Sequence, residues 1–387
     1  MATGVSRSTS PTVAVIGGGV IGLSIAWRLA QAGAAVTVFD RGRTGGAASH
    51  AAAGMLAACA EAEPGEEKLI ALGRASQALW PSFAAELEAA AGMTIDLRRE
   101  GILDIALTAD DAARKHHHLE YQKALGLPVE WLSAAEVRKR EPHLGGRLAG
   151  ALFSPEDHQV DNRKLVAALR IAAEAAGVAI RENAQVQAVH LAQGGVGGMV
   201  FADGTHVPAD AVVVAAGAWS RQIEGLPSEL RPPVRPVKGQ MIALRMDAAA
   251  SLISHVLWVP GAYLVPRSDG RLLIGATVEE KGFDETLTAG GVLSLLEAAW
   301  RAIPAVEELP IEEMWVGHRP GSRDDAPVLG SAPVDGLFYA CGHGRNGILL
   351  TPITAQAMAD LIMTGEPQSA IDAFGIARFA RTAMAAE

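Results

Sequence analysis

The first forty residues place short apolar runs and glycine turns in the order strand, helix, strand. Residues 12–16 form a β-branched run typical of a buried parallel strand. Residues 20–31 carry apolar side chains at helical spacing, and Gly33 follows as a C-terminal cap. A second apolar run, residues 36–39, ends at Asp40. This pattern predicts a βαβ unit.

The first turn of this unit has the spacing Gly17-x-Gly19-x-x-Gly22. Such glycines allow a tight turn, a close approach of a pyrophosphate to the backbone, and close packing of the helix on the strand. The helix N-terminus offers unpaired N–H groups to the phosphates. Asp40 follows Gly22 at nearly the ~20-residue distance expected of a carboxylate that binds a ribose hydroxyl. The unit therefore predicts dinucleotide binding, but it leaves open which dinucleotide and which reaction.

The rest of the chain mixes helical and strand patterns. Helices are predicted at residues 67–91, 110–125, 161–176, 290–303 and 348–363, and strands at residues 94–107, 178–182, 185–190, 212–214, 240–245, 262–266, 271–277, 311–316 and 337–341. Residues 152–159 are predicted as a loop, residues 231–239 as an irregular linker between domains, and residues 317–321 as a turn at a strand end. The pattern indicates an α/β fold that is α+β overall, with a parallel sheet and a separate antiparallel sheet.

Composition and charge narrow the classes of function. The net charge of −10 argues against non-specific nucleic-acid binding. No apolar run approaches 18 residues, so we expect no membrane span, and the polar residues 1–10 are predicted as a disordered tail rather than a secretory signal. Two cysteines make no disulfide framework and suit a cytoplasmic protein. No His/Cys cluster has metal-ligand spacing, because the three consecutive histidines at 116–118 point in different directions on a helix.

Three further stretches of small residues suit a backbone that passes close to a flat ligand. Residues 43–55 are rich in Gly, Ala and Ser and follow Asp40 directly. The strand at residues 212–214 runs into Ala215, Ala216 and Gly217, and the strand at residues 337–341 runs into a segment containing three more glycines before an apolar helix.

Together these motifs resemble the flavin-dependent D-amino acid oxidase superfamily, and within it the bacterial glycine oxidases. The similarity spans roughly residues 13–361. The motifs that carry it are the glycine fingerprint with Asp40-Arg41, Ala48-Ser49, residues 51–56 (AAAGML), 212–219 (VVVAAGAW), 263–267 (YLVPR), 274–277 (IGAT), 317–321 (GHRPG) and 342–350 (GHGRNGILL).

The resemblance implies FAD as the cofactor and a discontinuous Rossmann-like FAD-binding domain beside a smaller antiparallel-sheet substrate domain. The FAD-binding domain would comprise residues 11–90, 145–230 and 320–375, and the substrate domain residues 91–144 and 231–319. The expected cofactor-binding residues are Gly17, Gly19, Val20, Ile21, Gly22, Asp40, Arg41, Ala48, Ser49, Ala53, Gly54, Met55, Val186, Gly217, His343, Gly344, Arg345, Asn346, Gly347, Ile348 and Leu349.

The resemblance also implies a substrate site. Arg319 is similar to the arginine that binds the substrate carboxylate, and Tyr263 to the hydroxyl that closes over it. Arg345 and Met55 match further residues of the pocket. The implied reaction removes hydride from glycine or a small amino acid (sarcosine, D-alanine or D-proline) and gives an imine, then a 2-oxo acid, ammonia and hydrogen peroxide. In the glycine-oxidase interpretation the imine would feed thiamine thiazole synthesis.

Three alternatives differ from this amine oxidase. A D-amino acid dehydrogenase would keep the fold but pass electrons to a quinone or carrier instead of O₂. An NAD-dependent dehydrogenase would lack a tightly held flavin, and a flavin-binding protein without turnover would not oxidise amines. The expected partners are a small amino acid or amine and O₂, with no nucleic acid and no membrane, and we expect a homo-oligomer.

Overall fold

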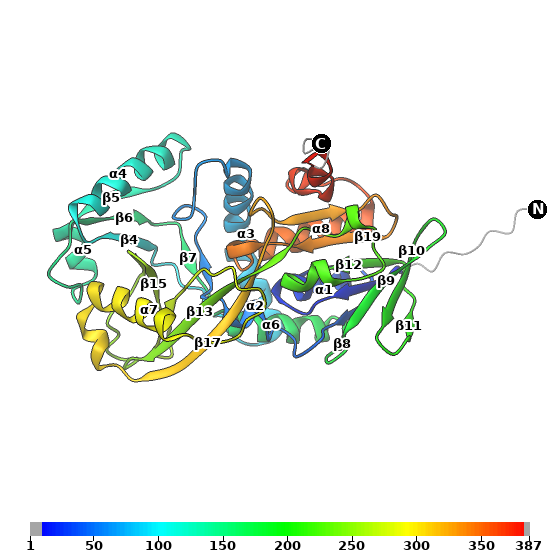
Figure 1. Cartoon of the computed structure of the whole chain (residues 1–387), viewed down its shortest axis with the longest axis horizontal. Helices are drawn as coiled ribbons and strands as arrows, with labels where there is room; N and C mark the ends of the chain where they lie inside the picture. Colours follow the sequence, from blue (N-terminus) through cyan, green and yellow to red (C-terminus); the bar gives the residue numbers. More distant parts are fainter. Residues whose placement is uncertain (1–9, 383–387) are drawn as a thin grey trace, which may run out of the picture.

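The chain is built on two large β-sheets with helices around them (Figure 1), and the computed structural model describes residues 10–382. The predicted tail, residues 1–10, lies outside the described residues apart from Ser10. Within residues 10–382, no helix combines the length and the apolar character that crossing a bilayer requires.

The first sheet has six strands, and all its pairs are parallel except that of the edge strand β18 with β19. In spatial order its strands are β18 (Val328–Ser331), β19 (Leu337–Cys341), β12 (Ala211–Val214), β1 (Thr12–Ile16), β2 (Ala35–Phe39) and β8 (Ala179–Arg181). Strand β1 is central and pairs in parallel with both β2 and β12, so the carboxyl ends of these three strands meet at one edge of the sheet. In a doubly wound sheet this edge is the place where ligands bind.

The two faces of this sheet are covered differently, in keeping with the alternation of side chains along a strand. On one face Val13 and Val15 pack into a core shared with α1, α3, α6 and α8, and on the other Ala14 and Ile16 pack against a small three-stranded sheet. The small sheet has the order β11 (His206–Val207), β10 (Gly195–Phe201), β9 (Val186–Ala192).

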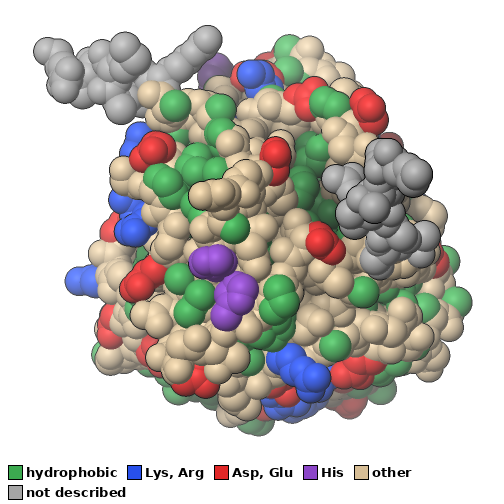
Figure 2. Space-filling model, turned by 90° about the vertical axis from the view of Figure 1, so that its right-hand side faces the viewer, with side chains coloured by type: hydrophobic (Ala, Val, Ile, Leu, Met, Phe, Trp, Pro, Cys, Tyr) green, Lys and Arg blue, Asp and Glu red, His purple; other side chains and the backbone are tan. Residues whose placement is uncertain are grey.

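Acidic and basic side chains are interspersed on the end of the molecule that Figure 2 shows. The eight helices are α1 (Val20–Gln31), α2 (Ala48–Ala51), α3 (Glu67–Ala91), α4 (Ala109–Ala124), α5 (Ala134–Arg140), α6 (Asn162–Ala175), α7 (Ala289–Ala302) and α8 (Thr351–Thr364), counted within the described residues.

The second sheet has eight strands and is antiparallel except for the pair β14–β4. Its strands in spatial order are β17 (Ile311–Gly321), β13 (Arg235–Arg245), β16 (Arg271–Gly275), β15 (Ala262–Pro266), β14 (Val256–Val259), β4 (Ile102–Ala106), β6 (Gly150–Ser154) and β5 (Glu130–Ser133). One face packs on α7, and the other packs on Ala53 and Ala57 of the segment that follows α2. Strand β3 (Met55–Leu56) lies in this segment and pairs in antiparallel fashion with β7 (His158–Gln159). The predicted fold class is thereby confirmed.

Four local predictions differ from the structure. The expected turn at 317–321 is wrong, and the expected irregular linker at 231–239 is wrong from residue 235 onward, because residues 235–239 belong to β13 and residues 317–321 to its paired strand β17. The expected loop at 152–159 instead contains the end of β6 and all of β7. The last long helix begins at Thr351 rather than at Ile348, since the preceding residues form turns and a 3-10 helix. The predicted division into domains stays a prediction; strand β6, which it assigns to the FAD-binding domain, pairs within the eight-stranded sheet.

Candidate active site

Two glycines of the first turn occupy positions that only glycine fits. Gly17 has a φ of +109°, and a Cβ there would stand 2.3 Å from the carbonyl oxygen of Ala215. A Cβ at Gly22 would stand 1.9 Å from the carbonyl oxygen of Gly17. Backbone atoms cannot move aside as a flexible side chain can, so these glycines let α1 start close to β1 and β12. The turn has the tight geometry that a backbone phosphate cradle requires.

Asp40 and Ser49 flank the N-terminus of α1. The two carboxylate oxygens of Asp40 accept hydrogen bonds from the backbone N–H groups of Gly18 and Gly42, each at 2.8 Å. The Ser49 hydroxyl oxygen accepts from the Val20 N–H at 3.0 Å. The first turn of α1 contains no acidic residue that would offset the positive end of the helix dipole. A helix N-terminus with a hydroxyl and a ribose-binding acid beside it fits the pyrophosphate and AMP ribose of FAD.

Three other predicted nucleotide contacts lie at or near this edge of the sheet. Arg41 follows Asp40, and its guanidinium stacks 4.1 Å above the ring of Trp219. Gly217 follows β12 with a φ of +53° and opens a 3-10 helix. Val186, in β9, is buried in a cluster with Phe39. Their contacts with the cofactor stay predictions.

A buried arginine holds the small-residue run at residues 43–55 against the second sheet. The Arg267 guanidinium donates to the carbonyl oxygens of Ala53 at 2.8 Å and Val160 at 2.9 Å, and to the Asn162 side-chain oxygen at 2.9 Å. A Cβ at Gly54, whose φ is +71°, would stand 2.0 Å from the Val160 carbonyl oxygen. Burial lowers the pKa of Arg267 to about 10, so the group stays charged at neutral pH. The sequence motif contained Arg267, but its role as the anchor of this run was missed.

The glycine segment after β19 is fixed by α3. The Leu349 carbonyl oxygen accepts from the Ser76 hydroxyl at 2.6 Å and from the Trp80 ring N–H at 2.9 Å. His343 is buried, and burial lowers its pKa to about 3, so its imidazole is neutral. Its Nε2 lies 3.2 Å from the Thr354 hydroxyl. The segment at residues 343–349, expected to contact the flavin, is therefore rigidly placed and carries no charge at His343.

The structure brings the predicted carboxylate-binding pair together on one face of the second sheet. Burial raises the pKa of Tyr263, and the positive charge of the nearby Arg319 opposes this shift. The Tyr263 hydroxyl also donates to the Met241 sulfur at 3.3 Å. Nη1 of Arg319 donates to the Thr277 carbonyl oxygen at 3.1 Å. Arg319 is half-buried and lies within a strand rather than in the predicted turn.

Met55 lies beside this pair through a tryptophan that the sequence analysis did not select. The Trp258 ring N–H donates to the Met55 sulfur at 3.3 Å, and the ring centroids of Trp258 and Tyr263 are 6.4 Å apart. Trp258 lies on β14, a strand that was also missed, although residues 256–259 (VLWV) are β-branched, apolar and aromatic residues of the kind that strands favour. Met55, Trp258, Met241 and Tyr263 belong to one hydrophobic cluster.

Arg345 is held by two carboxylates on the segment before α3. Its Nε donates to Glu61 at 3.0 Å, and its Nη2 donates to Glu66 at 2.5 Å. Burial raises the pKa of Glu61 to about 7, opposed by Arg345 and more weakly by Arg319. Glu61 also acts on the pKa of Tyr263, so these four groups form one electrostatic cluster. Glu61 was missed because residues 57–66 carry no helix or strand pattern that would place them near the site.

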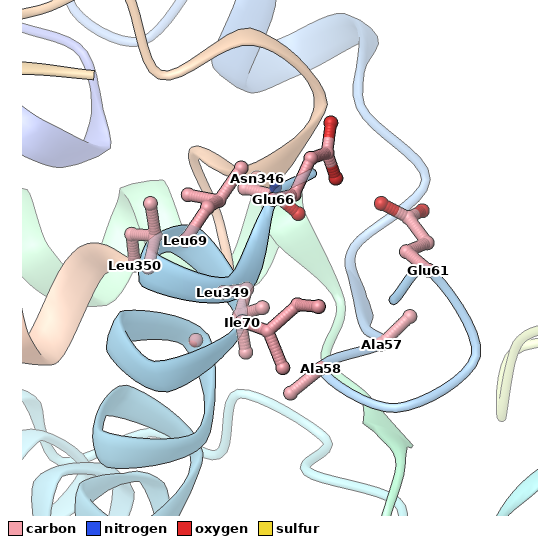
Figure 3. A pocket seen from close by; sticks show the side chains of 10 residues that line it. Ala57, Ala58, Glu61, Glu66, Leu69, Ile70, Asn346, Leu349 and Leu350 are labelled. Atoms are coloured by element: carbon pink, nitrogen blue, oxygen red, sulfur yellow. The ribbon is translucent and has the colours of Figure 1, made fainter. Parts of the chain in front are cut away.

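Both acids line a small cavity between this segment and α3 (Figure 3). Apart from Asn346, the rest of its lining is apolar and includes Leu69 and Leu349. Its volume of about 10 Å³ is room for about one water molecule, so the cavity is no substrate pocket. The contact of Arg345 with substrate stays a prediction. In the described part of the chain, no group of three or more His, Cys, Asp or Glu side chains is placed to hold a metal ion.

Comparison with known proteins agrees with this geometry. The model of the DAO family, described as FAD dependent oxidoreductase, matches residues 12–361. The chain is 39% identical over 373 residues to glycine oxidase from Geobacillus kaustophilus, which covers 96% of each chain. The crystal structure of glycine oxidase from that organism superposes with a TM-score of 0.88, at 38% identity over 95% of this chain and 99% of the other.

Two further relatives have names other than glycine oxidase. The bifunctional protein ThiO/ThiG of Synechocystis sp. is 41% identical over 380 residues, which is 97% of this chain but only 55% of that protein. The crystal structure of iminodiacetate oxidase from Chelativorans sp. BNC1 has a TM-score of 0.85 at 29% identity, covering 94% of this chain and 98% of the other.

The expectation of an FAD-dependent enzyme is confirmed by the family match and by the similarity of nearly the whole chain to flavoprotein oxidases. The glycine turn, the acid that follows it and the buried anchor of the small-residue run fit that cofactor. The chain therefore belongs to the DAO family of FAD-dependent oxidoreductases.

Proposed function

We propose that this flavin-dependent oxidase of CH–NH₂ groups acts on glycine or another small amino acid, namely sarcosine, D-alanine or D-proline. The amine would be oxidised to an imine, which water converts to a 2-oxo acid and ammonia for glycine and D-alanine, or to a 2-oxo acid and methylamine for sarcosine, whereas the cyclic imine of D-proline would keep its nitrogen; O₂ takes up the two electrons and two protons and becomes hydrogen peroxide. The observation that carries the proposal is the half-buried Arg319 guanidinium beside the Tyr263 hydroxyl, on a face of the sheet that is otherwise apolar. The names of the relatives agree with it.

The electrostatics of the pair suit a carboxylate. Nη1 of Arg319 is already bonded to the Thr277 carbonyl oxygen, which leaves the other donors of the guanidinium free to face a ligand carboxylate in a fixed direction. Burial raises the pKa of Tyr263, so its hydroxyl keeps its proton at neutral pH and can donate a hydrogen bond to a carboxylate oxygen. Both groups sit at the edge of an apolar cluster, where a charge-assisted hydrogen bond is stronger than in water.

The apolar walls support a small substrate. Met55, Trp258 and Met241 lie next to Tyr263, and no basic side chain among them would take a proton from the substrate amine. We propose that the amine is held by backbone carbonyl oxygens and that catalysis depends on alignment and the exclusion of water. FAD, when bound, supplies the two-electron acceptor for the oxidation of the carbon–nitrogen bond.

The residues that would hold FAD follow from the site. The turn at Gly17–Gly22 and Ser49 would bind the pyrophosphate, and Asp40 the AMP ribose. The segments at residues 48–55 and 343–349 would enclose the flavin, fixed by Arg267 and by α3 respectively.

We further propose a cytoplasmic homo-oligomer that supplies thiamine thiazole synthesis. The two cysteines are free and buried, as suits a reducing compartment. Leu293, Trp300 and Ile311 are exposed apolar side chains that a second copy could cover. The thiamine role is supported by a relative named ThiO/ThiG.

Peroxide release in air from the purified FAD-loaded protein tests the proposal. The panel contains glycine, sarcosine, D-alanine and D-proline, with L-alanine as the control. Peroxide from one or more of the first four is expected. Reduction of an artificial electron acceptor without peroxide would favour a D-amino acid dehydrogenase instead, and a flavin that no amine reduces would overturn the proposal.

A further inference from the structure

Strand β13 presents two functionally different faces beside Arg319. Gly239 and Met241 point to the face that carries Arg319 and Tyr263, as their contacts with these two side chains show. Lys238 points to the opposite face, since side chains alternate along a strand, and there it meets the segment at residues 277–288. One short piece of strand thus touches both the arginine and the chain segment that binds the arginine.

On the first face, Arg319 lies across Gly239. The residue directly opposite Arg319 in the β13–β17 ladder is Val237, so Gly239 is its diagonal neighbour on the same face. A Cβ at Gly239 would stand 2.5 Å from Nη1 of Arg319 and 3.0 Å from both Cζ and Nη2. The missing side chain lets the guanidinium cross β13 and reach the Thr277 carbonyl oxygen on the far side. Any larger residue would occupy the place of the guanidinium.

On the opposite face, Lys238 is fully buried and holds the neighbouring segment. Its ammonium donates to the Asp284 carboxylate and to the Thr286 carbonyl oxygen, each at 2.6 Å, and lies 3.8 Å from Glu279. Lys238 also exchanges two backbone hydrogen bonds with Glu279, both at 2.9 Å. The hydrogen bond from Lys238 lowers the pKa of Asp284 to about 2, so the Asp284 carboxylate is ionised throughout the neutral range.

The neighbouring residue Gln240 completes the attachment. Its backbone N–H donates to the Thr277 hydroxyl at 2.8 Å, and its side-chain amide donates to Glu279 at 2.7 Å. Thr277 therefore has a fixed position, and its carbonyl oxygen fixes Nη1 of Arg319. Burying an ammonium group without an ionised partner costs free energy, so moving residues 277–288 away from Lys238 on β13 would be unfavourable.

We infer that Lys238 and Gly239 are positioning residues for Arg319: the glycine sets the height of the guanidinium above the sheet, and the lysine, through residues 277–288, sets its direction. The inference rests on the proposed role of Arg319 in binding the substrate carboxylate. It assigns a task in the active site to residues that the sequence pattern placed in a linker. A purely structural role would stabilise the sheet without affecting the binding of a carboxylate.

The glycine is tested with Gly239→Ala, against Gly290→Ala as the matched control. Gly290 lies in the same part of the chain on α7, and a Cβ there would meet no atom within 4 Å. The measurements on FAD-loaded protein are the Kd for acetate by calorimetry, the KM and kcat for glycine, the bound FAD and the Tm. Gly239→Ala should raise the acetate Kd and the glycine KM at least about tenfold, the loss expected when one charge-assisted hydrogen bond is misplaced, with FAD retained. Gly290→Ala should leave both constants unchanged.

The lysine is tested with Lys238→Met, which keeps much of the length and removes the charge, and with Lys238→Arg. Lys238→Met should raise the acetate Kd in the same direction, and Lys238→Arg should restore most of it. Variants that lower the Tm but leave the acetate Kd at the wild-type value would assign both residues a structural role only and would overturn the inference.

The outcomes separate this inference from the proposed function. If wild-type protein oxidises glycine and Gly239→Ala has wild-type constants, the inference fails while the function stands. If no amine reduces the wild-type flavin but Gly239→Ala still weakens acetate, the function fails while the positioning of Arg319 stands.

Discussion

Replacing Arg319 by leucine removes the cation that we place against the substrate carboxylate. Leucine is similar in length to the aliphatic part of the arginine and keeps the strand pairing of β17 with β13 intact. The side chain is half-buried, no carboxylate within residues 10–382 forms an ion pair with it, and its Nη1 donates to the Thr277 carbonyl oxygen. The change should therefore affect ligand binding far more than folding.

The magnitude follows from the donors that face the ligand. Nη1 is already bonded to Thr277, so a carboxylate gains about two charge-assisted hydrogen bonds from the rest of the Arg319 guanidinium. Each contributes about 1.5–3 kcal/mol, and we take the lower value because the group is half exposed to water. The total of about 3 kcal/mol corresponds to a roughly 100-fold weaker Kd for acetate and a similar rise in the KM for glycine.

Calorimetry with acetate and steady-state kinetics with glycine measure the two effects on FAD-loaded protein. Arg301→Leu is the matched control, because Arg301 is an exposed arginine on α7. Arg319→Lys keeps the charge but loses the planar fork, and we expect it to lie between wild type and leucine. FAD should remain bound in all three variants. An Arg319→Leu protein with the wild-type acetate Kd and glycine KM would refute the assignment.

Three further substitutions test other parts of the site. Asp40→Ala should weaken FAD about tenfold, measured by fluorescence of released flavin, while substrate preference is kept; equal FAD affinity would contradict the ribose role. Burial raises the pKa of Glu61 from 4.5 to about 7, so the wild type loses stability as the pH rises through this range. Glu61→Gln lacks that loss, and its Tm relative to wild type should rise between pH 5 and pH 8; a constant or falling difference would exclude the shift. Arg267→Met leaves the carbonyl oxygen of Ala53 unpaired and should cost about 3 kcal/mol in urea unfolding and loosen FAD; an unchanged midpoint would contradict its anchoring role.

The opening unit could be predicted residue by residue because its signals are local. The strand, the glycine turn, the helix at residues 20–31 and Asp40 follow one another within thirty residues, and each signal acts on its immediate neighbours. The same holds for the helix at residues 67–91.

The second sheet was harder because its strands are made by long-range pairing. Proline and glycine in residues 231–239 and 317–321 indicate irregular structure locally, yet residues 235–239 pair one by one with residues 317–321. Pro236 lies opposite Pro320. Lys238 exchanges its backbone hydrogen bonds with Glu279 and not with β17. Because bonding directions alternate along a strand, Pro236, two residues earlier, also faces away from β17, so its missing N–H leaves no gap in the β13–β17 ladder. A pattern that looks only at neighbours cannot detect such a pairing.

The candidate site divides in the same way. Arg319 and Tyr263 could be selected from a family motif, and the structure brings them together. Glu61, Trp258 and Gly239 could not, because each depends on a partner at least 80 residues away. Trp258 and Gly239 take their roles from the packing of the second sheet, and Glu61 from its contact with Arg345, and the sequence pattern resolved neither.

The most direct test of the account is anaerobic mixing of the FAD-loaded protein with glycine, sarcosine and D-alanine, followed by the flavin absorbance. The account predicts that at least one of them bleaches the flavin within seconds, that admitting air restores the colour with release of hydrogen peroxide, and that Arg319→Leu bleaches far more slowly at the same amine concentration. A wild-type flavin that stays oxidised with all three amines would contradict the central claim.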